Sequence, residues 1–187
     1  MALIDAILQE LEQEAQTTRR VLERVPDNQL AWRPHPKART LGELALHVAT
    51  VPGSVAEFIA SPSPTQVPDF IDPSPPSAAE LIAALDESIA KAKQVLGGMD
   101  DATIMATWRM MHGEREVFAL PRVALLRSIM LNHWYHYRGQ LTVYSARVEH
   151  SHPLYIRPVY TARARTRTPS PDAIAALLFF MGSQMVD

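Results

Sequence analysis

The chain has 187 residues, 47% hydrophobic and 20% charged, which suits one compact domain that buries roughly 70% of the surface its unfolded chain exposes. Its 18 Lys and Arg residues nearly balance 20 Asp and Glu residues, and the formal net charge of −2 gives no electrostatic excess for holding a nucleic acid. The sequence has no cysteine, which excludes disulfides, thiolate nucleophiles and cysteine-based metal sites. Any metal must therefore be held by imidazole or oxygen, so the seven histidines are the residues to follow.

The apolar stretches of the chain predict neither a signal peptide nor a membrane span. At the N-terminus, Asp5 and Glu10 interrupt the apolar residues and no basic residues precede them, unlike a secretory signal. The longest apolar run, residues 174–181, is too short to cross a bilayer. We therefore expect a cytoplasmic protein that does not bind membranes.

Two amphipathic helices are predicted in the first third of the chain. Apolar residues recur every three or four positions from Ile4 until the sequence reaches Pro26, which predicts the first helix. Thr40 and Glu43 have the spacing of a capping box and predict the start of the second helix. Pro52 lies inside that helix, where its missing N–H predicts a bend.

Two more long helices complete the predicted bundle. Residues 61–76 contain six of the fifteen prolines and predict an extended crossover. A second capping box at Ser77 opens the third helix, which closes at Gly97 and Gly98. After a small hairpin that turns at residues 112–113, the fourth helix should run from Pro121 to about Arg147. Four helices of this kind predict an all-α four-helix bundle.

The predicted bundle ends near residue 147 and leaves an extension. We expect residues 1–147 to form the bundle domain and residues 148–187 to form an irregular extension that contains Arg and Pro. The extension has a short apolar segment with Leu177, Leu178, Phe179 and Phe180, which would leave an apolar patch if exposed. This segment suggests an arm exchanged between two copies, so we expect a homodimer.

Three histidines lie on predicted helix faces where they could meet. His47 follows Leu44 by three residues and precedes Val51 by four, so it shares the apolar face of the second helix. On the fourth helix, His133 lies on the inward face and His136 follows at i+3, a spacing that brings side chains together. Three imidazoles from two facing helices would make a metal site with an open position, as catalytic zinc prefers.

The same residues have a simpler interpretation. The aromatic stretch from Trp134 to Tyr137 is also typical of a packing face whose histidines hydrogen-bond to tyrosine or to the backbone. Residue spacing alone leaves the metal site and the packing face both open.

Three stretches of the sequence resemble the DinB-like family of metal-dependent four-helix bundles. They are NHWYHYRGQLTVY at 132–144, TLGELALHVA at 40–49 and LAWRP at 30–34. The resemblance implies a bundle of up-down-down-up order. The family's ligands are one histidine on the second helix and two histidines four residues apart on the last helix, the second just before Arg-Gly-Gln. His47 and His133 match two of these positions, and Tyr137 occupies the third.

The tyrosine decides which ligands we predict. A neutral phenol, with an ordinary pKa near 10, is a poor ligand unless the metal deprotonates it, whereas His136 is a good donor about 100° further around the helix. We predict a divalent metal ion, zinc or nickel, on His47, His133 and His136. Tyr137, as a hydrogen-bond donor or fourth ligand, and Gln140, as a group that orients its neighbours, are the predicted catalytic residues.

The resemblance also implies a class of reaction. Characterised relatives include thiol-dependent transferases and isomerases that use a low-molecular-weight thiol. Our first hypothesis is therefore a metal-dependent transferase, or a related hydrolase, acting on a small molecule with such a thiol as partner. The alternative is a metal-free bundle that binds a ligand or oligomerises, with Tyr137 filling the place of the metal. No phosphate-binding loop or serine nucleophile motif supports a nucleotide-dependent enzyme or a serine hydrolase.

Overall fold

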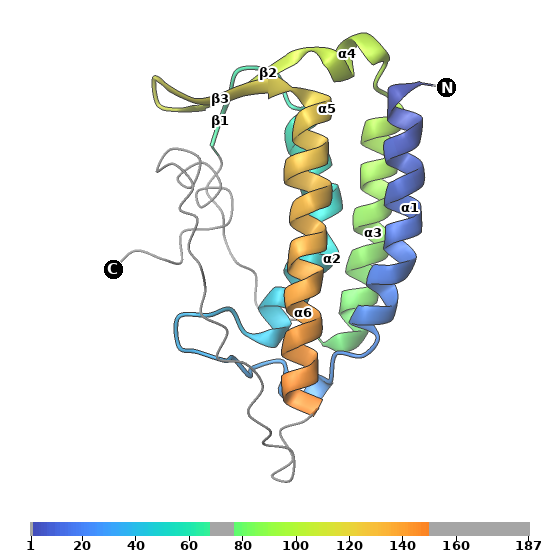
Figure 1. The fold of residues 1–187 in the computed structure, drawn as a ribbon, viewed down its shortest axis with the longest axis vertical. Helices are drawn as coiled ribbons and strands as arrows, with labels where there is room; N and C mark the ends of the chain where they lie inside the picture. Colours follow the sequence, from blue (N-terminus) through green and yellow to red (C-terminus); the bar gives the residue numbers. More distant parts are fainter. Residues whose placement is uncertain (1, 68–76, 150–187) are drawn as a thin grey trace, which may run out of the picture.

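The fold is set by four long helical stretches, seen in a computed structural model that describes residues 2–67 and 77–149 (Figure 1). They are α1 (Leu3–Leu22), α2 (Leu41–Ala60), α3 (Ala78–Gly97) and a last continuous stretch that ends with α6 (His133–Glu149). In Figure 1, α1 and α6 run downward while α2 and α3 run upward. The bundle and its up-down-down-up order are therefore confirmed. The predicted C-terminal extension lies outside the described residues, apart from its first two positions, which belong to α6.

The last helical stretch changes its winding before it reaches α6. It begins with α5 (Arg122–Leu125), passes through a π-helical segment (Leu126–Asn132) and continues as α6. The sequence predicted one uninterrupted α-helix here. A π-helical turn is wider than an α-helical one, so the segment changes which side chains of α6 face α2.

A small sheet lies across the end of the bundle where α5 begins (Figure 1). The predicted hairpin is confirmed: β2 (Thr107–His112) pairs antiparallel with β3 (Arg115–Pro121), and Gly113 supplies the positive φ of 62° at the turn. A two-residue strand that was not predicted, β1 (Thr65–Gln66), lies in the crossover and pairs parallel with β2. A short helix, α4 (Asp101–Met105), and a 3₁₀ turn (Asp27–Gln29) complete the described elements.

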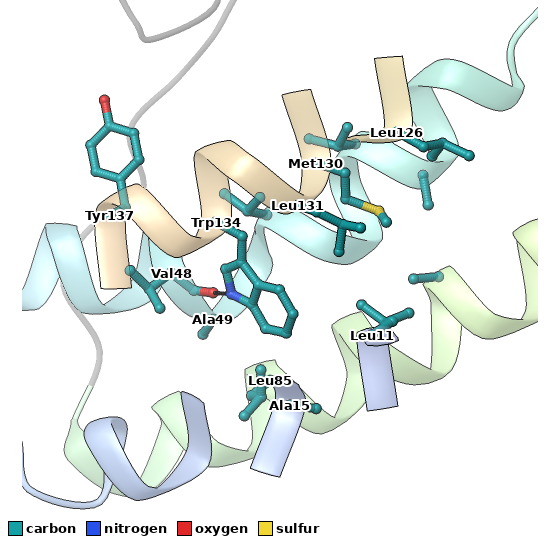
Figure 2. Packing of buried hydrophobic residues seen from close by; sticks show 14 of the residues in the cluster. Leu11, Ala15, Val48, Ala49, Leu85, Leu126, Met130, Leu131, Trp134 and Tyr137 are labelled. Carbon is teal, nitrogen blue, oxygen red and sulfur yellow. Dashed lines mark hydrogen bonds between the residues drawn. The ribbon is translucent and has the colours of Figure 1, made fainter. Parts of the chain in front are cut away.

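The apolar faces of the helices meet in one continuous core (Figure 2). Trp134 and Trp108 are its largest fully buried side chains. Trp134 points inward from α6 toward Leu11, Ala15 and Leu85, which come from α1 and α3. Within the described residues, none of the helices is long and apolar enough to span a membrane.

The beginning of α2 is fixed by the predicted capping box. The Glu43 N–H donates to Thr40 Oγ1 (3.1 Å), and the Thr40 N–H donates to the Glu43 carboxylate (2.6 Å). The next two free donors of the helix are satisfied by the preceding loop, since the N–H groups of Leu41 and Gly42 donate to the carbonyls of Trp32 and Leu30 (2.8 and 2.9 Å). The loop before α2 is therefore held against the helix end.

Pro52 frees backbone groups of α2 for contacts with other helices. Because proline has no N–H, the Val48 carbonyl loses its partner within the helix, and it accepts a hydrogen bond from Trp134 Nε1 (2.8 Å, Figure 2). The Gly53 N–H donates to Ser88 Oγ of α3 (2.8 Å). The proline position thus joins α2 to both α6 and α3.

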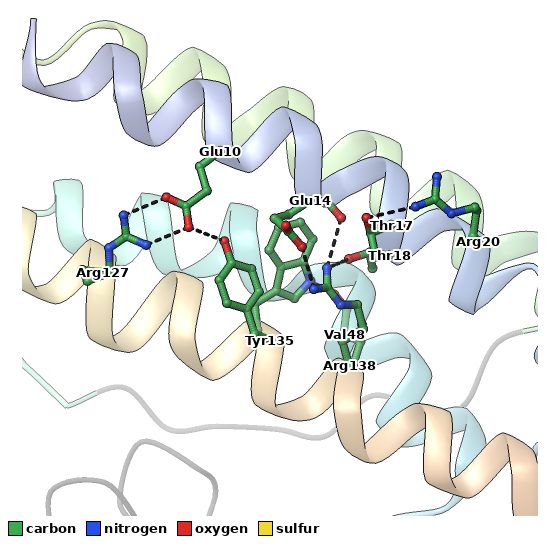
Figure 3. A network of polar contacts seen from close by, with 10 residues as sticks. Glu10, Glu14, Thr17, Thr18, Arg20, Val48, Arg127, Tyr135 and Arg138 are labelled. Carbon is green, nitrogen blue, oxygen red and sulfur yellow. Dashed lines mark hydrogen bonds and ion pairs between the residues drawn. The ribbon is translucent and has the colours of Figure 1, made fainter.

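A row of polar contacts joins α1 to the last helical stretch (Figure 3). Arg127 makes two hydrogen bonds of 2.7 Å to the Glu10 carboxylate, which also accepts from Tyr135 Oη (2.8 Å). Further along, Arg138 pairs with the Glu14 carboxylate (2.6 Å) and donates to the Glu14 carbonyl and to a buried threonine, Thr18. We call these residues the α1–α6 seam.

Candidate functional site

Two of the predicted ligands meet between facing helices. His47 lies on α2 and His133 begins α6, and their Nε2 atoms are 3.0 Å apart. The two residues are 86 positions apart in the sequence, so the fold alone brings them together. In the form described, one Nε2–H donates to the other Nε2.

Burial keeps both imidazoles neutral. Desolvation lowers the pKa of His47 from 6.5 to about 3 and that of His133 to about 4, and the positive charge of Arg39 acts in the same direction on both. Neutral imidazole is the form that donates a lone pair to a metal ion. Neither ring has to lose a net positive charge before coordination, and the ring whose Nε2 carries the hydrogen-bonding proton has only to hold that proton on Nδ1 instead.

The separation of the two nitrogens fits one shared metal ion. Nitrogen ligands lie about 2.0–2.1 Å from zinc, so two ligands at angles between about 90° and 110° are roughly 2.8–3.4 Å apart. The observed 3.0 Å falls within this range. The pair fits a two-imidazole chelate that needs further ligands from another source.

Tyr137 lies against both imidazoles. Its ring centroid is 4.7 Å from that of His47 and 4.6 Å from that of His133. Tyr137 is one turn after His133 on α6, and Figure 2 shows its hydroxyl pointing away from the core in which Trp134 is buried. The phenol therefore lines the histidine pair, at the position where the resemblance places a third ligand.

The other two predicted site residues lie apart from this pair. His136 is exposed, and its Nε2 accepts a hydrogen bond from the side-chain amide of Gln140 (2.8 Å), one turn later on the same helix. Among the described residues, no three His, Asp or Glu side chains form a group that could hold a metal ion. The structure thus gathers two of the three predicted imidazoles, and His136, the predicted third ligand, lies apart from them in this arrangement.

Sequence reasoning missed Arg39, which faces the histidine pair. It precedes the capping residue Thr40, and its guanidinium carbon lies 5.7 Å from the centre of the Tyr137 ring. Arg39 is half-buried. The sequence feature that could have identified Arg39 is its position directly before the capping box. That box fixes the residues that lead into α2, the helix that carries His47.

An aromatic pair continues from the site toward the loop end of the bundle. Trp32, in the loop before α2, and Tyr144, near the end of α6, pack edge to face with ring centroids 5.7 Å apart. Burial raises the pKa of Tyr144, and the charge of Arg39 opposes this rise. Arg39 therefore lies within electrostatic reach of both Tyr137 and Tyr144.

Comparisons with known proteins agree on the fold. A family model described as the DinB superfamily matches residues 10–141. A DinB-like protein from Bacillus cereus superposes with a TM-score of 0.60 at 22% identity, covering 83% of this chain and 97% of its own. The DinB-like protein YjoA from Bacillus subtilis superposes with a TM-score of 0.58 at 17% identity, covering 78% and 94%. No curated protein matches the chain.

Proposed function

The chain belongs to the DinB superfamily, and from this membership and the meeting of His47 with His133 we propose that it is a metal-dependent enzyme. The metal is one divalent ion, zinc or nickel, held by these two imidazoles. The reaction is a transfer to or from a small molecule with a low-molecular-weight thiol as partner, or a related hydrolysis. The observation that carries the proposal is the 3.0 Å separation of two half-buried, neutral imidazole nitrogens on facing helices.

When bound, the metal ion supplies a positive charge that lowers the pKa of a coordinated thiol or water. His47 and His133 hold the site between α2 and α6. Tyr137 excludes water from one side with its ring and offers a hydroxyl as hydrogen-bond donor or further ligand. Two protein nitrogens leave several coordination positions open, which suits an ion that must also accept a substrate atom.

Gln140 and His136 have a different role in this proposal. Because their side chains bond to each other (2.8 Å) on the exposed side of α6, they are not part of the two-imidazole chelate. Their place one turn apart beside Tyr137 suits contact with an incoming small molecule.

The first test is the metal content of untagged protein, measured by mass spectrometry after purification without added metal and after incubation with zinc. We expect about one zinc or nickel ion per chain, and loss of that ion in His47→Ala and His133→Ala. His136→Ala is the matched control, since it removes a histidine of the same helix that the chelate does not use. Tyr137→His should tighten zinc binding, because it places an imidazole one turn from His133.

Two outcomes would contradict the proposal. One is wild-type protein without stoichiometric metal even after incubation with zinc. The other is metal that stays bound in both His47→Ala and His133→Ala.

A metal-free ligand-binding bundle is the second candidate function. It is favoured by the direct hydrogen-bonding distance between the two imidazoles and by the Tyr137 ring packed against them. In this case the histidines satisfy each other inside the bundle. Thermal melting separates the two candidates: zinc should raise the melting temperature of a metal-binding protein and leave that of a metal-free bundle unchanged.

A further inference from the structure

A groove lies on the outside of the bundle between α1 and α3. Its volume is about 390 Å³, and within the described part of the chain its lining comes from these two helices alone. Figure 1 shows α1 and α3 packed side by side, whereas His47 and His133 belong to α2 and α6, the other two helices of the bundle. The proposed metal site therefore makes no use of this groove.

The floor of the groove is apolar. Ala15 of α1 and Leu85 of α3 are buried there, and Ile89 is half-buried beside them. The short side chains of Ala15 and Ala90 leave a hollow between the two helices, in which side chains of another molecule can pack. Covering this floor removes apolar surface from water, which favours association.

One ion pair crosses the groove at each end. Glu12 of α1 pairs with Lys93 of α3 (3.3 Å), and Arg19 of α1 pairs with Asp86 of α3. On each helix the two charged residues are seven positions apart, which is about 10 Å along the axis. The four side chains are between 31% and 65% exposed, so their charges also face the solvent.

The signs of these four charges make the face complementary to itself. Along α1 a negative charge is followed by a positive one, and each has the opposite charge beside it on α3. If a second copy is turned by 180° about an axis in the plane of the face and parallel to the helices, its Lys93 lies over Glu12. If the axis runs across the helices, its Arg19 lies over Glu12. In both arrangements all four contacts join opposite charges.

The same pattern argues against other partners. Two positive and two negative side chains cancel, so the face has no net charge with which to attract a nucleic acid or a strongly charged peptide. A second copy of the chain has opposite charges at the required spacing and an apolar floor of its own. It is therefore the occupant that this face fits.

We propose that two copies of the chain bind each other about a two-fold axis through the α1–α3 face, which consists of Glu12, Arg19, Asp86, Lys93 and the apolar floor between them. Stable interfaces bury about 1,200–2,000 Å² in total, and two helices over about two turns each supply less than this. The contact therefore acts together with the exchange of the C-terminal segment predicted from the sequence. It goes beyond the proposed function, because the histidine pair lies on the other two helices.

The test reverses the charges of the face in the full chain. Glu12→Lys with Asp86→Lys makes all four positions positive, and Arg19→Glu with Lys93→Glu makes all four negative. By sedimentation equilibrium, each double variant alone should have a dimer dissociation constant at least about tenfold above that of the wild type, because every contact across the axis becomes repulsive. When the two variants are mixed, one of them labelled with ¹⁵N, native mass spectrometry should find mainly the mixed dimer.

A matched control separates the position of the charges from their number. Glu57→Lys with Glu116→Lys adds the same charge as the positive variant and also breaks two exposed ion pairs, but outside the α1–α3 face. Its dimer dissociation constant should equal that of the wild type. Thermal melting checks that each variant is folded, and zinc content should be the same in all of them, since none alters the histidine pair.

Three results would overturn the inference. One is a wild-type chain that stays monomeric at every concentration measured. Another is a charge-reversed variant that dimerises as tightly as the wild type, which would leave the exchanged segment as the contact that holds the dimer. The third is a mixture in which the two variants show no preference for each other. Failure of zinc to bind would contradict the proposed function and leave these dimer measurements unaffected.

Discussion

The histidine pair shows how burial prepares a side chain for chemistry. In water, an imidazole is half protonated near pH 6.5, but loss of solvent around His47 and His133 penalises the charged form and keeps both rings neutral at neutral pH. Arg39 adds a repulsive positive charge to this effect. The environment that keeps the rings neutral makes them good ligands. For the same reason, protonating either ring must lower the free energy of unfolding.

Acid is expected to destabilise the metal-free protein through these two residues. Between the lowered pKa values of about 3 and 4 in the folded protein and the ordinary 6.5, the unfolded chain binds protons that the folded chain does not. The free energy of unfolding is thus highest above about pH 6.5 and falls as the pH decreases. At about pH 5 the loss should approach 2 kcal/mol per imidazole.

Urea unfolding in the presence of a chelator, at a series of pH values from about 7 to 5, measures this loss. The double variant His47→Gln with His133→Gln should have a much flatter profile, whereas His136→Gln should keep the wild-type slope. Glu10, whose pKa the Arg127 guanidinium lowers from 4.5, contributes only at more acidic pH. A wild-type profile that is flat over this range would contradict the expectation.

At the scale of the elements, the meeting of α2 and α6 depends on a missing hydrogen bond. Pro52 leaves the Val48 carbonyl without a donor from its own helix, and Trp134, the residue after His133, supplies one from α6 (2.8 Å). Val48 is likewise the residue directly after His47, so each partner of this hydrogen bond follows one histidine of the pair. One interhelical hydrogen bond therefore sits next to both imidazoles and fixes how the two helices align.

A double-mutant cycle tests this coupling between proline and tryptophan. Trp134→Phe removes the donor and leaves a buried carbonyl unsatisfied, which should cost about 1–3 kcal/mol in addition to lost packing. In a Pro52→Ala background, the new backbone N–H can bond to the Val48 carbonyl, so the same tryptophan substitution should cost less. Chemical unfolding of the four proteins gives the coupling energy. Strictly additive costs would show that the carbonyl is satisfied in another way.

Sequence patterns predicted these elements well where local chemistry decides. The capping box at Thr40 and Glu43 needs only residues three positions apart, so the start of α2 was predictable. The π-helical segment at Leu126–Asn132 was not, because a change of winding is stabilised by packing between helices rather than by a local signal.

The candidate site was predictable only in part for the same reason. Residue spacing placed His47 and His133 on inward faces, and the structure brings them together. At i+3 and i+4 from His133, however, His136 and Tyr137 are nearly equivalent by spacing. The packing of α6 against α2 decides between them, with Tyr137 buried and His136 exposed.

Across the whole molecule, the bundle is closed by two kinds of contact. Apolar side chains fill the centre, while the α1–α6 seam joins the first and last helices with charged groups. Within the seam, the pair of Arg138 with Glu14 has side chains only 16% and 23% exposed, compared with 51% and 32% for Arg127 and Glu10. Since solvent screens exposed pairs, the Arg138–Glu14 pair should contribute more to holding α1 in place.

The assembly of the chain is the last property that the sequence allows us to predict. The segment with Leu177, Leu178, Phe179 and Phe180 lies outside the described residues, and its apolar side chains would be costly to leave in water. We expect two chains to exchange this segment and form a homodimer, with twice the 20.8 kDa mass of one chain. Sedimentation equilibrium should find a dimer for the full chain and a monomer for a chain cut after Ser170. Since the bundle residues are intact in the shorter chain, it should still melt cooperatively, and a dimer that persists after the cut would place the contact on the bundle instead.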